Sequence, residues 1–65
     1  EEENEYNQAC LEAICGNTDR ALELLQVAIE DNPSYINWAQ HDPDLDAIRH
    51  DQRFYMLIQS FAQNR

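Results

Sequence analysis

Turn-forming residues are scarce in this chain, and their scarcity limits its fold more than any other feature. The 65 residues include one glycine, Gly16, and two prolines, Pro33 and Pro43. β-Hairpins depend on glycine-rich turns, and no stretch alternates apolar and polar residues for long enough to make a strand. The sequence therefore predicts an all-α fold, with one helical hairpin followed by two or three short helices.

The first half of the chain has the apolar periodicity of two helices. The first, over about residues 3 to 15, has apolar residues at the three-and-four spacing of one helix face: Tyr6, Ala9, Cys10, Ala13 and Ile14. Gly16 then suits a left-handed C-terminal cap. The second is expected over about residues 18 to 31, capped by Asn17 or Thr18. Its apolar face consists of Ala21, Leu22, Leu24, Leu25, Ala28 and Ile29. Because only two or three residues join the helices, they must fold back as an antiparallel pair.

The second half predicts three short helices, each begun by a polar capping residue. Asn32 precedes a helix of about seven residues, Asp42 precedes one or two turns, and Asp51 precedes the last helix. The apolar residues of that last helix recur at i, i+3, i+4 and i+7: Phe54, Leu57, Ile58 and Phe61. The aromatic residues expected in the core are Trp38, Phe54 and Phe61. Tyr6 and Tyr55 fit either a core or a surface position.

The charge balance favours a basic partner and disfavours nucleic acid. The formal net charge is −9, with four arginines and no lysine. Phosphate binding depends on clustered Lys and Arg, and an anionic membrane surface repels negative charge. No apolar run approaches the about 20 residues of a membrane-spanning helix. Residues 1–31 hold nine acids and one arginine, so a ligand of that half is expected to be basic.

The two cysteines are expected to be free thiols. Cys10 and Cys15 lie five residues apart in one helix, so their side chains point about 140° apart and no disulfide is expected between them. Two free thiols indicate a reducing compartment, and we expect a cytoplasmic protein in which both act as small core hydrophobes. An acidic neighbourhood opposes thiolate formation, so Cys10 is not expected to be a nucleophile.

A pattern of small residues at fixed spacing covers residues 2 to 35. The matched positions are Ala9, Gly16, Ala21, Leu25, Ala28 and Pro33. This pattern resembles a tetratricopeptide repeat (TPR), the 34-residue helical hairpin of protein-interaction scaffolds. The runs 42–46 (DPDLD) and 51–54 (DQRF) resemble the C-terminal cap helices of bacterial TPR arrays. Gln52 replaces a proline of that motif. Three further positions are polar where the family has large apolar residues: Glu5, Gln8 and Glu12.

The resemblance implies a piece of a right-handed α–α superhelix, cut from a longer chain. Residues 1–33 would be the hairpin and residues 34–65 the capping helices. It implies a module that binds a basic or apolar segment of a partner protein, is not an enzyme and needs no cofactor. Its groove would be lined by Glu3, Tyr6, Asn7, Cys10, Ala13 and Ile14. This interpretation requires contact between the first two helices and burial of Trp38. Two alternatives remain open: a purely structural end-cap, and self-association through the exposed hairpin face.

Two patterns of metal-ligating residue types are incomplete. Asp42, Asp44 and Asp46 match the first ligands of a calcium loop, but the turn glycine falls at Ala47 and the bidentate glutamate at Arg53. His41 and His50 have no third ligand at a zinc-site spacing. We therefore expect the aspartates to cap helices and predict no metal site. A metal-regulated or thiol-based activity is the remaining alternative.

Overall fold

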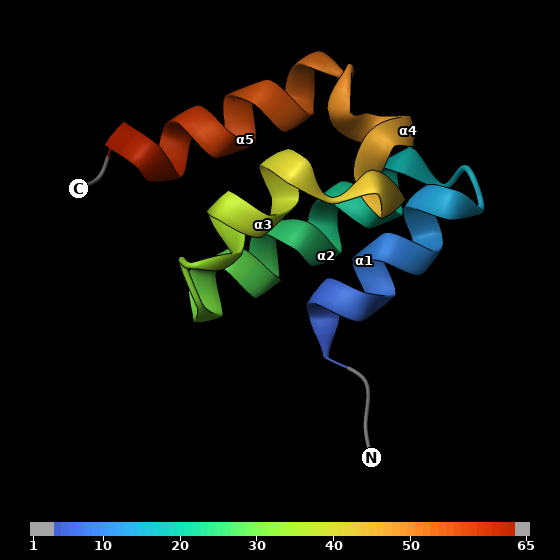
Figure 1. Cartoon of the computed structure of the whole chain (residues 1–65), viewed down its shortest axis with the longest axis horizontal. Coiled ribbons are helices and arrows are strands. Elements are labelled where there is room, and N and C mark those ends of the chain that lie inside the picture. The colour runs from blue at the N-terminus through green and yellow to red at the C-terminus, as the bar shows by residue number, and fades with distance from the viewer. Residues whose placement is uncertain (1–3, 64–65) are drawn as a thin grey trace.

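A computed structural model describes residues 4–63, and over that range the chain is all-helical (Figure 1). The elements are α1 (Glu5–Ile14), α2 (Thr18–Asp31), α3 (Tyr35–His41), a 3-10 turn η1 (Pro43–Leu45), α4 (Asp46–Arg49) and α5 (Gln52–Gln63). The described range holds no β-strand, so the all-α prediction is confirmed. None of its helices combines the length and the apolar character that crossing a membrane requires.

Helices α1 and α2 form the predicted antiparallel hairpin, and small residues line their contact. Ala9, Ala21 and Ala28 are buried there, and Leu25 fills the space beside them with no exposed surface. Gly16 has a φ of 90° and ends α1 as predicted. Its amide donates to the Ala13 carbonyl at 3.1 Å, and the next amide donates to the Glu12 carbonyl at 2.8 Å. This pair of bonds is a Schellman cap, which turns the chain back into α2.

The C-terminal segment folds onto the hairpin and closes its core. Turn η1 packs against α1, α4 packs against both α1 and α2, and α3 packs against α2. The side chains that close the core are buried: Ala39, Leu45, Ile48, Phe54 and Ile58. In Figure 1, α2 and α3 lie between α1 and α5. Helix α5 buries Phe54 and Ile58 in this core, and its partly buried Leu57 and Phe61 pack against it.

Two of the predicted helix caps are present. The predicted cap at Asn32 is wrong, because α3 begins after Ser34 without a side-chain cap bond, and Asn32 Oδ1 accepts from the Ser34 amide at 3.2 Å in the preceding turn. Asp42 Oδ1 accepts from the Asp44 amide at 3.0 Å. Asp51 Oδ1 accepts from the Arg53 amide at 2.8 Å. The prediction of a side-chain cap on α2 is wrong, because the Asn17 side chain makes no cap bond. Its amide instead donates to Glu12 Oε1 at 2.7 Å and so ties the turn back to α1.

Some aromatic residues and one thiol lie elsewhere than predicted. Phe54 is buried and Phe61 half-buried, but Trp38 is 63% exposed, so its prediction as a core residue is wrong. The physical reason is the shortness of α3, in which Ala39 takes the inward position and turns the preceding Trp38 aside. Tyr6 is buried, whereas Tyr55 is 62% exposed. Cys15 is exposed at the end of α1, so only Cys10 is a core thiol.

Candidate functional site

An aromatic cluster joins α1 to α3 and runs from the core to the surface. Tyr6 of α1 stacks on Tyr35 of α3, with ring centroids 4.5 Å apart and planes 8° apart. Trp38 meets both rings edge-on, at centroid distances of 6.2 Å and 5.8 Å. Such edge-to-face pairs add about 0.5–1.5 kcal/mol each beyond area burial. The cluster therefore holds an exposed indole on a buried tyrosine.

Carboxylates border this cluster. Asp42 Oδ2 accepts a hydrogen bond from the Tyr6 hydroxyl at 2.7 Å and from the Cys10 thiol at 3.9 Å. Asp42 is half-buried and accepts a hydrogen bond from the Asp44 amide, whereas Asp44 is exposed. Arg49 also donates to the Asp42 carbonyl oxygen. We call Trp38, Tyr6, Tyr35, Asp42 and Asp44 the aromatic–acidic surface.

The Tyr6 hydroxyl and the Cys10 thiol, which donate to Asp42, stay protonated at neutral pH. Burial, followed by the charges of Asp42 and Asp44, raises the pKa of the Cys10 thiol to about 11. Burial and the hydrogen bond to Asp42 raise the pKa of the Tyr6 hydroxyl above its usual value. A protonated thiol is a poor nucleophile. Cys10 and Tyr6 therefore act as hydrogen-bond donors that hold the Asp42 carboxylate.

One set in the described range brings three side chains of metal-ligating types together, one thiol and two carboxylates. The Cys10 sulfur and carboxylate oxygens of Asp42 and Asp44 lie within 4.8 Å of one another. A metal ion would require the Cys10 thiolate, which the raised pKa of this thiol opposes. Asp46, the third aspartate of the calcium-like run, instead forms an ion pair with Arg49. The arrangement fits a hydrogen-bonded link between α1 and η1 better than a metal centre.

The residues predicted to line a groove do not share one exposed face. Tyr6, Cys10 and Ala13 are buried, because η1 and α4 pack over this side of α1. An open groove at these three positions is therefore a wrong prediction for this chain. Asn7 and Ile14 are exposed, and Glu3 lies outside the described residues.

Sequence reasoning missed Trp38 and Tyr35 as surface-forming residues and assigned Asp42 only a capping role. The spacing of Trp38 three residues after Tyr35 was the available signal, since i and i+3 share a helix face. The same face brings both rings against α1.

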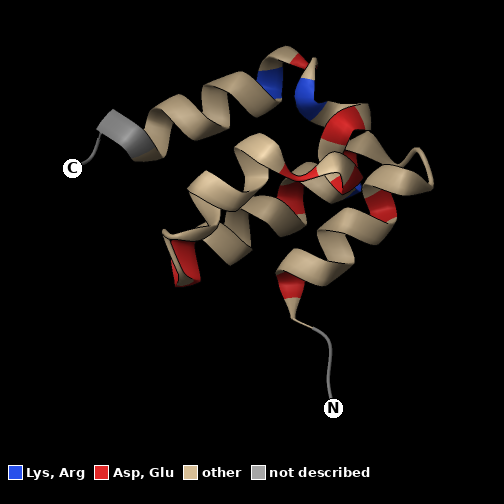
Figure 2. Ribbon diagram, viewed as in Figure 1, with Lys and Arg blue, Asp and Glu red and all other residues tan. Residues whose placement is uncertain are grey.

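Charge is unevenly placed around the molecule. Figure 2 shows basic segments where α4 meets α5, whereas acidic segments lie along α1, α2, η1 and α4. Each arginine of residues 4–63 forms an ion pair: Arg20 with Glu23, Arg49 with Asp46, and Arg53 with Asp19 and Asp51. The cations are thus already engaged, and the surplus of acids sets the sign of the surface.

Comparisons with protein-family models, with curated proteins and with solved structures find no match to this chain. The class of the molecule is therefore defined by its own geometry. It is a small all-α domain with a two-helix hairpin, a helical C-terminal cover and an aromatic–acidic surface.

Proposed function

We propose that this chain is a non-catalytic protein-interaction module that binds a basic segment of a partner protein at the aromatic–acidic surface. The observation that carries the proposal is an exposed indole, Trp38, packed on the ring whose hydroxyl binds the Asp42 carboxylate. Tryptophan is enriched among the residues that dominate interface energies. An arginine or lysine of the partner would lie on the indole face and pair with Asp44.

The expected affinity of a single basic residue is modest. A cation on an exposed aromatic ring contributes about 0.5–1 kcal/mol, and an exposed ion pair contributes about 0.2–1 kcal/mol. Useful binding therefore requires several such contacts or neighbouring apolar ones. The net charge of −9 favours encounter with a basic segment and makes that encounter sensitive to salt.

This proposal does not depend on the TPR interpretation of the hairpin. The antiparallel contact of α1 with α2, the buried alanines that line it and the Schellman cap at Gly16 are consistent with a TPR-type hairpin. That interpretation also required burial of Trp38, and Trp38 is exposed. Leu45 and Ile48, both fully buried, close the hairpin instead.

Intrinsic fluorescence gives a direct test, because Trp38 is the sole tryptophan of the chain. Titration with a synthetic arginine-rich peptide should change the Trp38 emission, and the apparent affinity should fall between 20 and 500 mM salt, settings chosen to span roughly a fivefold change in screening length. A glutamate-rich peptide of equal length should leave the emission unchanged.

A matched pair of variants locates the contact. Trp38→Ala and Tyr55→Ala each remove an aromatic ring of nearly equal exposure, 63% and 62%. Measured by anisotropy of a labelled arginine-rich peptide, Trp38→Ala should weaken binding about twofold to fivefold, as expected for one exposed cation–π contact. Equal affinities of the two variants, or an affinity that ignores salt, would contradict the proposal.

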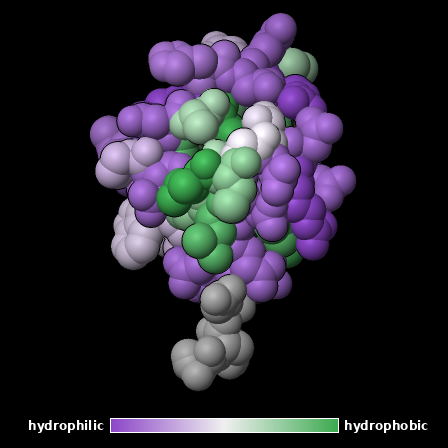
Figure 3. Space-filling model, turned by 90° about the vertical axis from the view of Figure 1, so that its right-hand side faces the viewer, coloured by the Kyte–Doolittle hydropathy of each residue, from purple (hydrophilic) through white to green (hydrophobic). Residues whose placement is uncertain are grey.

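A structural role is the alternative that one observation favours. Leu11 and Ile14 of α1 and Val27 of α2 are exposed, and Figure 3 shows a hydrophobic patch on the side that α1 presents. Such a face suits packing against a further helical unit or a second copy of the chain. Sedimentation across a hundredfold concentration range shows whether a second copy of the chain covers this face. Dimers that Ile14→Asp abolishes would favour self-association over the proposed interaction role.

A further inference from the structure

A groove runs between α2 and α5. Two adjoining depressions, of about 350 and 460 Å³, share Gln26, Arg53 and Leu57. The other lining residues are Asp19, Leu22, Glu23, Glu30, Met56, Ser60 and Phe61. The α2 members recur at i, i+3, i+4, i+7 and i+11, and the α5 members follow a similar spacing. Each set is therefore a stripe along one helix face, and the groove is about 16 Å long at 1.5 Å per residue.

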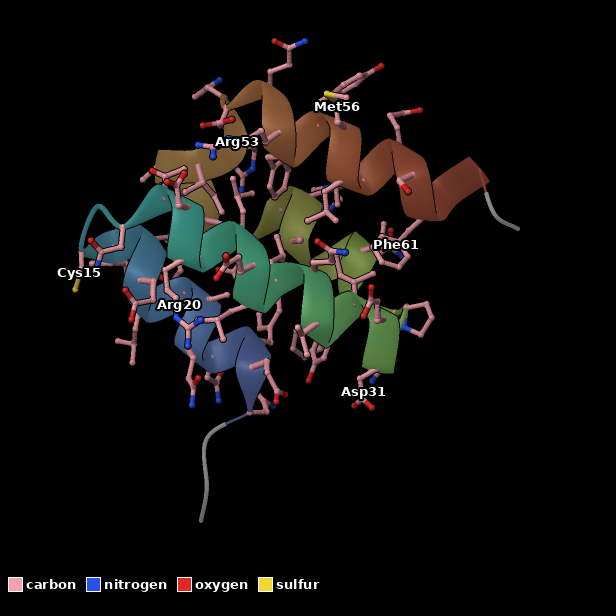
Figure 4. The ribbon with its side chains drawn as sticks, turned by 180° about the vertical axis from the view of Figure 1, so that it is seen from behind. Cys15, Arg20, Asp31, Arg53, Met56 and Phe61 are labelled. Carbon is pink, nitrogen blue, oxygen red and sulfur yellow. The ribbon has the colours of Figure 1, made fainter. Side chains whose placement is uncertain are left out.

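The floor of this groove is apolar and one of its ends is closed. Leu22 is buried, and Leu57 and Phe61 are half-buried. Arg53 extends from α5 to form an ion pair with Asp19 across one end. In Figure 4, Arg53 and Phe61 lie toward opposite ends of α5. The eight residue steps from Arg53 to Phe61 rise about 12 Å, a length that suits about two turns of a bound helix.

The α2 wall of the groove is acidic. Asp19, Glu23 and Glu30 line this wall. The one cation among the residues that line the groove is Arg53 of α5, which forms ion pairs with Asp19 and Asp51. Glu23 pairs with Arg20, but both side chains are more than half exposed. An exposed pair of this kind contributes little, so Glu23 can exchange Arg20 for a cation of a partner at low cost.

We propose that this groove docks a basic amphipathic helix of a partner, with apolar residues at i, i+3, i+4 and i+7 on the floor and Lys or Arg against Glu23 and Glu30. This is the helix-in-groove mode of recognition. It goes beyond the proposed function, because the groove contains no residue of the aromatic–acidic surface. Charge complementarity selects the occupant: a second copy of this acidic chain would bring like charge to the acidic wall.

The test uses a fluorescein-labelled synthetic peptide of 14 residues, made of Leu at the three-and-four spacing with Lys and Ala elsewhere. Anisotropy measures its affinity, and amide shifts of the ¹⁵N-labelled protein locate it. We expect the shifts along residues 19–30 and 53–61. Ser60→Arg places a cation in the groove at an exposed position, and should weaken binding at least about tenfold through like-charge contact.

Gln52→Arg is the matched control, because it adds the same charge to the same helix at an exposed position that does not line the groove. It should change the affinity less than about twofold. Equal weakening by both variants would overturn the proposal, as would equal binding of a peptide with Glu in place of Lys. Loss of binding in Trp38→Ala would show that the peptide binds at the aromatic–acidic surface, and would overturn the proposal. A dimer that Ser60→Arg disrupts would show that a second copy of the chain occupies the groove, and would overturn it as well.

Discussion

Alkaline pH should destabilise this protein through a single buried thiol. Burial raises the pKa of Cys10 to about 11 in the folded chain, whereas the reference pKa for an unfolded thiol is 9.0. Between these values the unfolded chain has released a proton that the folded chain keeps, so the free energy of unfolding falls as pH rises. Stability from this source is complete below pH 9 and lost through pH 11, in total roughly 2–3 kcal/mol. For a chain of this size, that is a large part of the about 3–10 kcal/mol available.

Urea unfolding followed by circular dichroism under reducing conditions, from pH 7 to pH 11, measures this loss. Cys10→Ala removes the titrating group and should flatten the decline, whereas Cys15→Ala removes an exposed thiol and should leave it in place. The comparison belongs between pH 9 and pH 10, because the raised pKa of Tyr6 adds a further loss at higher pH. A decline in Cys10→Ala as steep as in the wild type would refute the reasoning.

Three substitutions test the packing described above, each by chemical denaturation. Leu25→Ala empties a site with no exposed surface and should cost about 2–5 kcal/mol; a cost below 1 kcal/mol would mean that α1 and α2 are not in close contact. Gly16→Ala should cost about 1–2 kcal/mol through its φ of +90° alone, since no atom lies within 4 Å of the added Cβ; a neutral result would contradict the Schellman cap. Tyr6→Phe removes the bond to Asp42 and should cost about 1.5–3 kcal/mol; full stability would show that this link is not made.

The hairpin and the helix order follow from the sequence because their signals are local. Gly16, Asp42 and Asp51 each act on amides within a few residues of their own position. A hydrogen bond of that kind forms whatever the rest of the chain does. Helix boundaries were therefore largely accessible from the sequence: α2 was predicted to the residue, whereas α3 begins at Tyr35, three residues after its expected cap Asn32. The misplaced cap at Asn17 arose because a second local partner, Glu12, competed for the same side chain.

The groove prediction failed for a different reason. A helix periodicity shows that Tyr6, Cys10 and Ala13 share a face, but it does not show which segment covers that face. The covering contacts join residues more than 30 apart in the chain, as between Tyr6 and Asp42. They depend on where η1 lands after α3, which is set by packing rather than by any motif. The prediction for Trp38 was wrong for the same reason. Helix α3 has only seven residues, so few side chains fix how the helix is rotated about its own axis.

The contacts around Asp42 bear on how the aromatic–acidic surface would recognise a partner. This one residue accepts from Tyr6, Cys10 and the Asp44 amide through its carboxylate, and from Arg49 through its carbonyl. Three elements, α1, η1 and α4, are thereby fixed to one point directly after α3. Trp38 lies on that fixed base, packed against two rings. Because the position of Trp38 is set in the absence of a ligand, binding of the proposed basic segment would cost little side-chain ordering, and preorganisation of this kind would raise its affinity without new contacts.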